Sequence, residues 1–122
     1  QSGDERKAID EIMTKLRMVV QELDISLILV SHLKRPSGQG HEEGAATSLS
    51  QLRGSASIGQ LSDIVLSLER DGQADDPTER HTTTVRVLKN RFSGLTGPAC
   101  RLLYNLETGR MVEREEDFEE LQ

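Results

Sequence analysis

The sequence predicts an α/β fold, with a mainly parallel sheet followed by a C-terminal antiparallel β-hairpin. Apolar residues recur at helical spacing from Ala8 to Leu23, and the continuous apolar run "ISLILV" follows at once at 25–30. Such a run is typical of a strand buried on both faces of a parallel sheet. Further along, "HTTTVRVLK" and "PACRLLYNL" flank a Ser-Gly turn, which predicts two antiparallel strands.

The segments between these elements follow from their composition. Residues 34–48 are rich in glycine, proline and serine and predict a loop, and "LSQLRGSASIGQLSD" suggests short helical turns. "IVLSLER" at 64–70 predicts a second buried strand, "DGQADDPTER" an exposed loop, and "RMVE" a short last strand after the turn "ETG".

The length and charge of the chain predict one domain with an acidic tail. A chain of 122 residues suits a single domain. The net charge is −6, but residues 113–122 hold six acids and one arginine, so residues 1–112 carry only −1. The single cysteine permits no disulfide framework and favours a reducing compartment. No apolar run reaches transmembrane length, so no membrane association is expected.

The sequence contains no complete catalytic set. It has no G-x-x-x-x-G-K-[ST] phosphate loop, no Ser-His-Asp order and no metal-ligand spacing, so no metal site is predicted. His32 directly follows the predicted strand 25–30, where an imidazole could hydrogen-bond a phosphate or an attacking water, or could simply begin a surface loop. The cationic, glycine-containing loops suit binding of a sugar-phosphate backbone, and mobile surface loops are an equal alternative. Their candidate residues are Lys34, Arg35, Arg53, Gly54 and Ser55.

Two cations at the hairpin tip are the third candidate site. Lys89 and Arg91 are two residues apart, so strand geometry points both to the same side. An arginine there could stabilise the charge of a transferring phosphoryl group on a neighbouring molecule. A sheet edge protected by cations would show the same residues.

Taken in order, these blocks resemble a known family. "GDERKAIDEIMTKLRMV", "LILVSHLK", "HEEG", "LRGSASIGQLSDIVLSLER", "VLKNRFSGLTG" and "YNLETG" are similar to the C-terminal half of the helicase domain of phage replicative primase-helicases. That domain belongs to the DnaB-like hexameric helicases, to which Twinkle is also related. The resemblance implies a partial RecA-like fold over residues 1–112, in a ring-shaped motor that couples nucleoside triphosphate hydrolysis at subunit interfaces to translocation on single-stranded DNA and duplex unwinding.

The resemblance also implies roles for individual residues. Arg91 matches an arginine finger supplied in trans, with Lys89 as its companion. His32 matches the γ-phosphate sensor, and Gln60 matches the residue that couples nucleotide state to the DNA loops. Arg70 and Tyr104 match the pair that binds the nucleotide base, and residues Lys34, Arg35, Arg53, Gly54 and Ser55 fall in the two DNA-binding loops.

The family's phosphate loop, catalytic glutamate and magnesium-binding aspartate match no part of this chain and are expected upstream of residue 1. The cofactor implied is ATP or dTTP with Mg²⁺, and the 122 residues alone are predicted to be inactive. The partners implied are single-stranded DNA, a hexameric ring of identical subunits, and a replicative polymerase contacted through the acidic tail, residues 113–122. The implied location is the cytoplasm of a bacterium or of a phage-infected cell. A recombinase-type ATPase, or an interaction module acting through its tail, are the alternatives.

Overall fold

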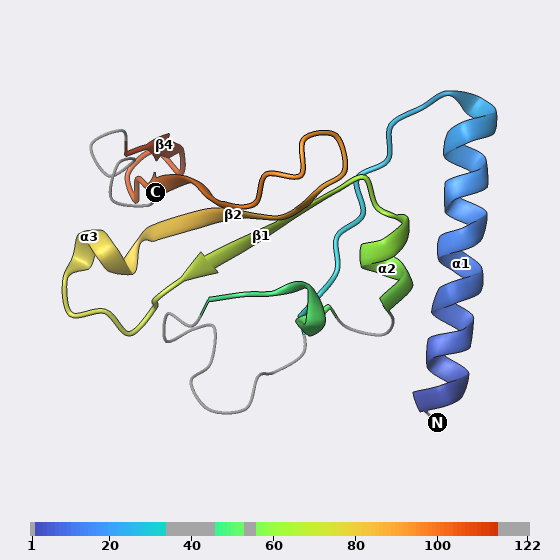
Figure 1. Ribbon diagram of the computed structural model, residues 1–122. Helices are drawn as coiled ribbons and strands as arrows, with labels where there is room; N and C mark the ends of the chain where they lie inside the picture. Colours follow the sequence, from blue (N-terminus) through green and yellow to red (C-terminus); the bar gives the residue numbers. More distant parts are fainter. Residues whose placement is uncertain (1, 34–45, 53–55, 115–122) are drawn as a thin grey trace.

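A computed structural model of the chain describes residues 2–33, 46–52 and 56–114. A long helix stands beside a twisted sheet, with a short helix between them (Figure 1). The elements are α1 (Ser2–Leu23), the 3₁₀ turn η1 (Leu49–Gln51), α2 (Ala56–Leu61), β1 (Ile64–Arg70), α3 (Pro77–Arg80), β2 (Thr82–Asn90), β3 (Gly97–Tyr104) and β4 (Met111–Glu113). The predicted helix, the hairpin and the short last strand are confirmed.

Helix α1 packs against α2 through its apolar stripe. Met13 on α1 and Ile58 on α2 are the buried hydrophobic residues of the described chain. The helix ends at Leu23, and the next residue, Asp24, adopts a left-handed backbone conformation with φ of 52°. The Ile25 amide then donates to the Val20 carbonyl at 3.3 Å, so a late carbonyl of the helix keeps a partner.

The sheet is antiparallel throughout, so the prediction of a mainly parallel sheet is wrong for the described residues. Its four strands follow in chain order, β1-β2-β3-β4, and each pairs antiparallel with the next. The connections explain this order, because short turns can join only antiparallel neighbours. The longest connection, from β1 to β2, contains α3, which is capped by Asp76 and begins at Pro77. The sequence pattern predicts only a loop there.

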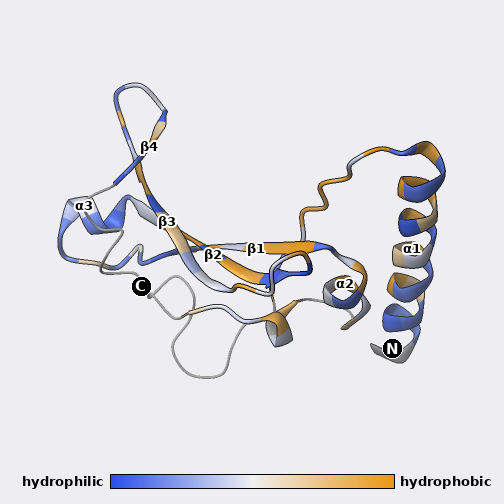
Figure 2. Ribbon diagram, turned by 45° about the horizontal axis from the view of Figure 1, so that its top comes forward, coloured by the Kyte–Doolittle hydropathy of each residue, from blue (hydrophilic) through white to orange (hydrophobic). Residues whose placement is uncertain are grey.

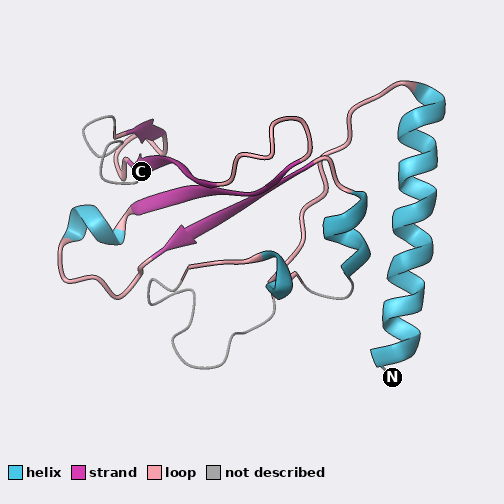
Figure 3. Ribbon diagram, viewed as in Figure 1, coloured by secondary structure: helices cyan, strands magenta, loops and turns pink. Residues whose placement is uncertain are grey.

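The apolar run 25–30 is not a strand in the structure, contrary to prediction. No described segment pairs with it, and Ile28 and Val30 are 91% and 87% exposed. The only pairing nearby in the described chain is a single bridge between Leu33 and Leu52. A run of β-prone residues forms a strand only where neighbouring strands satisfy its backbone groups. Among the described residues that neighbour is absent, so the run forms a loop (Figure 3), and its residues are exposed.

Strand β1 forms as predicted, but its apolar side is open. Ile64, Leu66 and Leu68 are 50%, 58% and 67% exposed, while Ser67 and Glu69 on the other side are buried. An open hollow of about 1000 Å³ lies between this apolar side, the run 25–33 and α1. Figure 2 shows hydrophobic residues along both β1 and the run that faces it. The prediction that 64–70 forms a buried strand is therefore wrong for its apolar side in the described residues.

Candidate functional site

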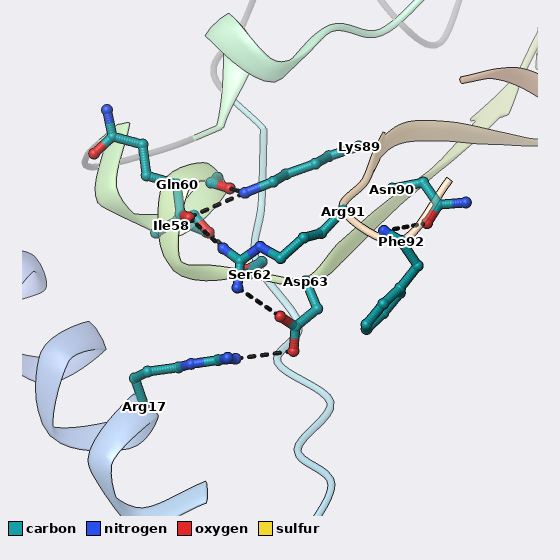
Figure 4. A network of polar contacts seen from close by, with 10 residues as sticks. Arg17, Ile58, Gln60, Ser62, Asp63, Lys89, Asn90, Arg91 and Phe92 are labelled. Carbon is teal, nitrogen blue, oxygen red and sulfur yellow. Dashed lines mark hydrogen bonds and ion pairs between the residues drawn. The ribbon is translucent and has the colours of Figure 1, made fainter. Parts of the chain in front are cut away.

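The Lys89–Arg91 pair lies where β2 ends, next to the C-terminal end of α2 (Figure 4). The Lys89 ammonium donates to the carbonyls of Gly59 and Gln60 at 2.8 and 3.0 Å. The Arg91 guanidinium donates to the same Gln60 carbonyl at 2.9 Å. The two cations therefore point to one side, as their spacing predicted. They satisfy carbonyls that the last turn of α2 leaves without helical partners.

The turn after β2 holds Arg91 in place. The Asn90 side-chain carbonyl accepts from the amides of Phe92 and Ser93, at 3.1 and 3.3 Å. Gly94, with φ of 76°, donates its amide to the Asn90 carbonyl at 2.7 Å and closes the turn. The Arg91 amide donates to the Asp63 carbonyl at 2.9 Å. These main-chain contacts fix the start of the Arg91 side chain, which is 40% exposed.

Gln60 shares this site through its backbone. Its carbonyl accepts from both cations, while the residue is exposed. Helix α2 begins at Ala56, directly after residues 53–55, and ends beside Arg91. Helix α2, six residues long, therefore runs from the residue that follows Ser55 to the carbonyls that bind Lys89 and Arg91.

Arg70 and Tyr104 lie on the same face and at the same end of the sheet. Arg70 pairs with Thr83 on β2, and Thr83 pairs with Leu102 on β3. Paired residues of antiparallel strands share a face, and Tyr104 lies two residues beyond Leu102 on that face. With one strand between them and an offset of two residues along β3, the two side chains start about 12 Å apart. That spacing leaves room for a flat ring between a guanidinium and a phenol.

The two candidate sites lie at opposite ends of the sheet. Arg70 pairs near the start of β2, whereas Arg91 follows its last residue, Asn90. At a strand rise of about 3.3 Å per residue, the two ends of β2 are roughly 25 Å apart. Figure 1 shows α3 at the first end and α2 at the second. The two predicted sites are therefore separated by nearly the whole length of β2.

His32 is exposed and follows the unpaired run 25–30. Contrary to prediction, His32 therefore does not follow a formed strand. Its contact with a phosphate stays a prediction. Next to it, the Leu33–Leu52 bridge joins the residues that precede the two predicted DNA loops. The loop residues Lys34, Arg35, Arg53, Gly54 and Ser55 lie outside the described residues, as does most of the tail, 115–122.

A buried polar network on the other side of β1 was not predicted from the sequence. The Thr47 amide and hydroxyl both donate to a Glu69 carboxylate oxygen at 2.7 Å. Arg86 on β2 holds the same carboxylate with two donors, at 2.7 and 3.2 Å, and Ser67 bonds the Thr47 hydroxyl. Polar residues alternating with the leucines of β1 were the available signal. The network ties the segment that follows 34–45 to the sheet.

The network makes stability depend on pH. Burial alone would raise the pKa of Glu69, but the hydrogen bonds from Arg86 and Thr47 outweigh it and hold the pKa below the ordinary value of 4.5. A carboxyl whose pKa is lowered by folding stabilises the fold above its unfolded-state pKa. That contribution disappears as the pH falls through the folded-state pKa.

We therefore expect Glu69→Gln to lower the free energy of unfolding at pH 7 by about 1–3 kcal/mol. Urea denaturation of both proteins measures this. The difference should shrink as the pH falls below 4.5, because Glu69 then becomes neutral in the unmodified protein too. The exposed Glu107→Gln is the control and should change little. A difference that stayed constant down to about pH 3, well below the ordinary carboxyl pKa, would contradict the assignment.

Contact of Arg70 and Tyr104 with a nucleotide base, and of Arg91 with a phosphate oxygen, stay predictions. In the described chain, no three His, Cys, Asp or Glu side chains gather where they could hold a metal ion. The described ranges also contain no helix with the length and apolar character needed to cross a bilayer.

The fold is an α/β domain with Arg91 after the end of β2, and with Arg70 and Tyr104 at the opposite end of the sheet. The DnaB-like helicase C terminal domain family matches residues 1–113. The chain belongs to this family.

Individual relatives agree with the family match. The chain is 46% identical over 110 residues to a DNA helicase/primase of Enterobacteria phage T3, covering 89% of this chain and 19% of the relative. It is 38% identical over 86 residues to a replicative DNA helicase DnaB of Treponema pallidum, covering 70% and 17%. A replicative DNA helicase DnaC of Bacillus subtilis is 29% identical over 115 residues, covering 94% and 25%. The chain thus spans about a fifth of the length of the first two of these curated relatives.

Proposed function

We propose that the chain is part of a ring-shaped replicative DNA helicase, acting in the cytoplasm of a bacterium or of a phage-infected cell. The whole protein hydrolyses ATP or dTTP with Mg²⁺ at the interfaces between identical subunits. It uses this energy to move along single-stranded DNA and unwind the duplex. The observation that carries the proposal is the placement of the two cationic sites at opposite ends of one sheet. A subunit built in this way meets one nucleotide at each end and so fits a ring.

In this arrangement Arg70 and Tyr104 hold the base of one nucleotide. Arg91 contacts the γ-phosphate of the nucleotide that the neighbouring subunit binds, and Lys89 supports it. The position of Lys89 favours a supporting role, because its ammonium is already used by the two carbonyls at the end of α2. His32 senses the γ-phosphate from the exposed stretch after 25–30.

The DNA contacts come from the two predicted loops that contain Lys34 and Arg35, and Arg53, Gly54 and Ser55. The Leu33–Leu52 bridge supports this, since both loops leave from one point of the fold. The other end of the first loop is tied to the sheet through Thr47 and Glu69, and the second loop leads into α2. Gln60, at the far end of α2, therefore couples the loops to Arg91.

The phosphate loop, the catalytic glutamate and the magnesium-binding aspartate are supplied by residues that precede this chain in the whole protein. The open apolar side of β1 and the exposed run 25–30 support this, because strands from the same domain would cover both. Without these parts the 122 residues cannot cradle a triphosphate. We therefore expect them to be inactive by themselves.

The test compares three purified proteins: the full-length protein, the same protein without residues 113–122, and the 122 residues alone. We expect the first two to hydrolyse nucleotide with stimulation by single-stranded DNA and to unwind a forked duplex. The isolated chain should show no turnover. The shortened protein should lose binding to its polymerase, because the acidic tail is proposed to make that contact. DNA-stimulated turnover by the isolated chain, or none by the full-length protein, would contradict the proposal.

A further inference from the structure

Asp63 lies between two arginines at the end of α2 (Figure 4). One carboxylate oxygen accepts from Arg91 at 2.7 Å, and the other accepts from Arg17 of α1 at 2.8 Å. The hydrogen bond from Arg17, with the charges of Arg17, Arg91 and Lys89, holds the pKa of Asp63 below its ordinary value. Asp63 is therefore ionised at neutral pH, with a different cation on each oxygen.

These contacts use the part of Arg91 that would bind a phosphate. One terminal nitrogen of the guanidinium donates to Asp63 and the other donates to the Gln60 carbonyl. An arginine binds a phosphate best when two neighbouring nitrogens of its fork face the oxygens together. In the structure the outer edge of this fork faces its own subunit. To offer that edge to a phosphate on another molecule, Arg91 has to leave Asp63.

Arg17 lowers the free energy needed to separate Arg91 from Asp63. A partly exposed carboxylate that loses its single cation loses the modest stabilisation of that ion pair and is solvated by water instead. Asp63 instead keeps Arg17 on its second oxygen when Arg91 leaves. The contact with Arg17 also makes the carboxylate a weaker partner for Arg91, because the charge is shared between two cations.

We propose that Asp63 is a positioning residue that holds Arg91 on its own subunit until a phosphate bound by the neighbouring subunit competes for it, and that Arg17 weakens this hold. This inference rests on the proposed role of Arg91 as a finger acting in trans. Asp63 touches neither nucleotide nor DNA in it. Asp63 and Arg17 act on hydrolysis only through Arg91.

The test uses the full-length protein with Asp63→Asn, Arg17→Gln and both together, and measures kcat and KM for nucleotide without DNA. Asp63→Asn should raise kcat about two- to fivefold, the range expected for one partly exposed ion pair. Arg17→Gln should lower kcat by a similar factor, because Asp63 then binds Arg91 alone. The double variant should match Asp63→Asn, since Arg17 acts through Asp63. KM should stay within about a factor of two in all three, and both effects should shrink at high salt.

A raised kcat in Asp63→Asn together with a lowered kcat in Arg17→Gln shows that the two residues position Arg91. A merely structural role would change kcat in the same direction in both variants. Loss of activity in both variants, or no change in either, would overturn the inference. Arg17→Gln alters only the surface of α1, so it tests the inference even if Asp63→Asn does not fold. An unchanged or raised kcat in Arg17→Gln would overturn the inference. Arg17→Lys should restore normal kcat. Glu79→Gln is the matched control, because Glu79 also bridges two arginines, Arg101 and Arg114, and it should leave kcat unchanged.

Failure of the proposed function would look different. If Arg91→Ala kept normal turnover, Arg91 would not be the finger and the proposed function would need revision. If Arg91→Ala abolished turnover while Asp63→Asn and Arg17→Gln had no opposite effects, only the inference about Asp63 would fail.

Discussion

Replacing Arg91 with alanine in the full-length protein should lower nucleotide hydrolysis by a factor of about 10³–10⁵, the range in which an arginine finger contributes to turnover. Nucleotide binding should be largely preserved, because an arginine from the neighbouring subunit acts mainly on the charge that develops during phosphoryl transfer. Steady-state hydrolysis and equilibrium binding of a non-hydrolysable nucleotide measure the two effects separately. Normal turnover would exclude the finger role.

Mixed rings give a sharper version of the same experiment. If Arg91 acts in trans, each variant subunit disables the nucleotide site of its neighbour while its own site stays intact. Adding Arg91→Ala subunits to rings of a phosphate-loop variant should therefore restore hydrolysis at some interfaces, although each variant alone is inactive. A lack of restoration in rings shown to be mixed would contradict action in trans. Arg110→Ala is the control for removal of an exposed arginine, since Arg110 lies in the β3–β4 turn, and it should behave like the unmodified protein.

Replacing Lys34 or Arg53 with alanine should weaken binding of single-stranded DNA and reduce its dependence on salt. Removing one phosphate contact should lower the slope of log K against log salt by about 0.7 for a single strand. Fluorescence anisotropy of a labelled oligonucleotide at several salt concentrations gives both quantities. DNA-stimulated hydrolysis should fall with binding, while hydrolysis without DNA changes little.

The change in the slope of log K against log salt distinguishes Lys34 and Arg53 from cations that affect DNA binding only through long-range electrostatics. Lys15 lies on the exposed side of α1 and is the matched control. Lys15→Ala should leave the slope as it is. An unchanged slope for both Lys34→Ala and Arg53→Ala would remove these residues from the DNA path.

The local elements could be predicted because each depends on neighbouring residues. Helix α1 follows from apolar spacing, and the β2–β3 hairpin follows from two β-prone runs around Ser93-Gly94. The common direction of Lys89 and Arg91 follows from strand geometry and is confirmed by their shared contact with Gln60. The family could also be recognised from the order and spacing of the sequence blocks, and the family match over residues 1–113 confirms it.

The wrong predictions concern features that depend on distant partners. The run 25–30 has the composition of a buried strand, yet no described segment pairs with it. Strand β1 has the same composition and, among the described strands, pairs only with β2. Whether such a run is buried, and whether a sheet is parallel, depends on which other strands lie beside it. A sequence pattern carries no information about that.

Local spacing and the order of short blocks were therefore enough to establish the helix, the hairpin and the family. Which charged side chains form ion pairs could be learned only from the tertiary structure. Arg17 and Arg91 are separated from Asp63 by 46 and 28 residues, and the three form one cluster because α1, the end of α2 and the end of β2 converge. Glu69 and Thr47 meet across 22 residues in the same way. Ion pairs depend on distance in space, and the packing of these elements sets that distance.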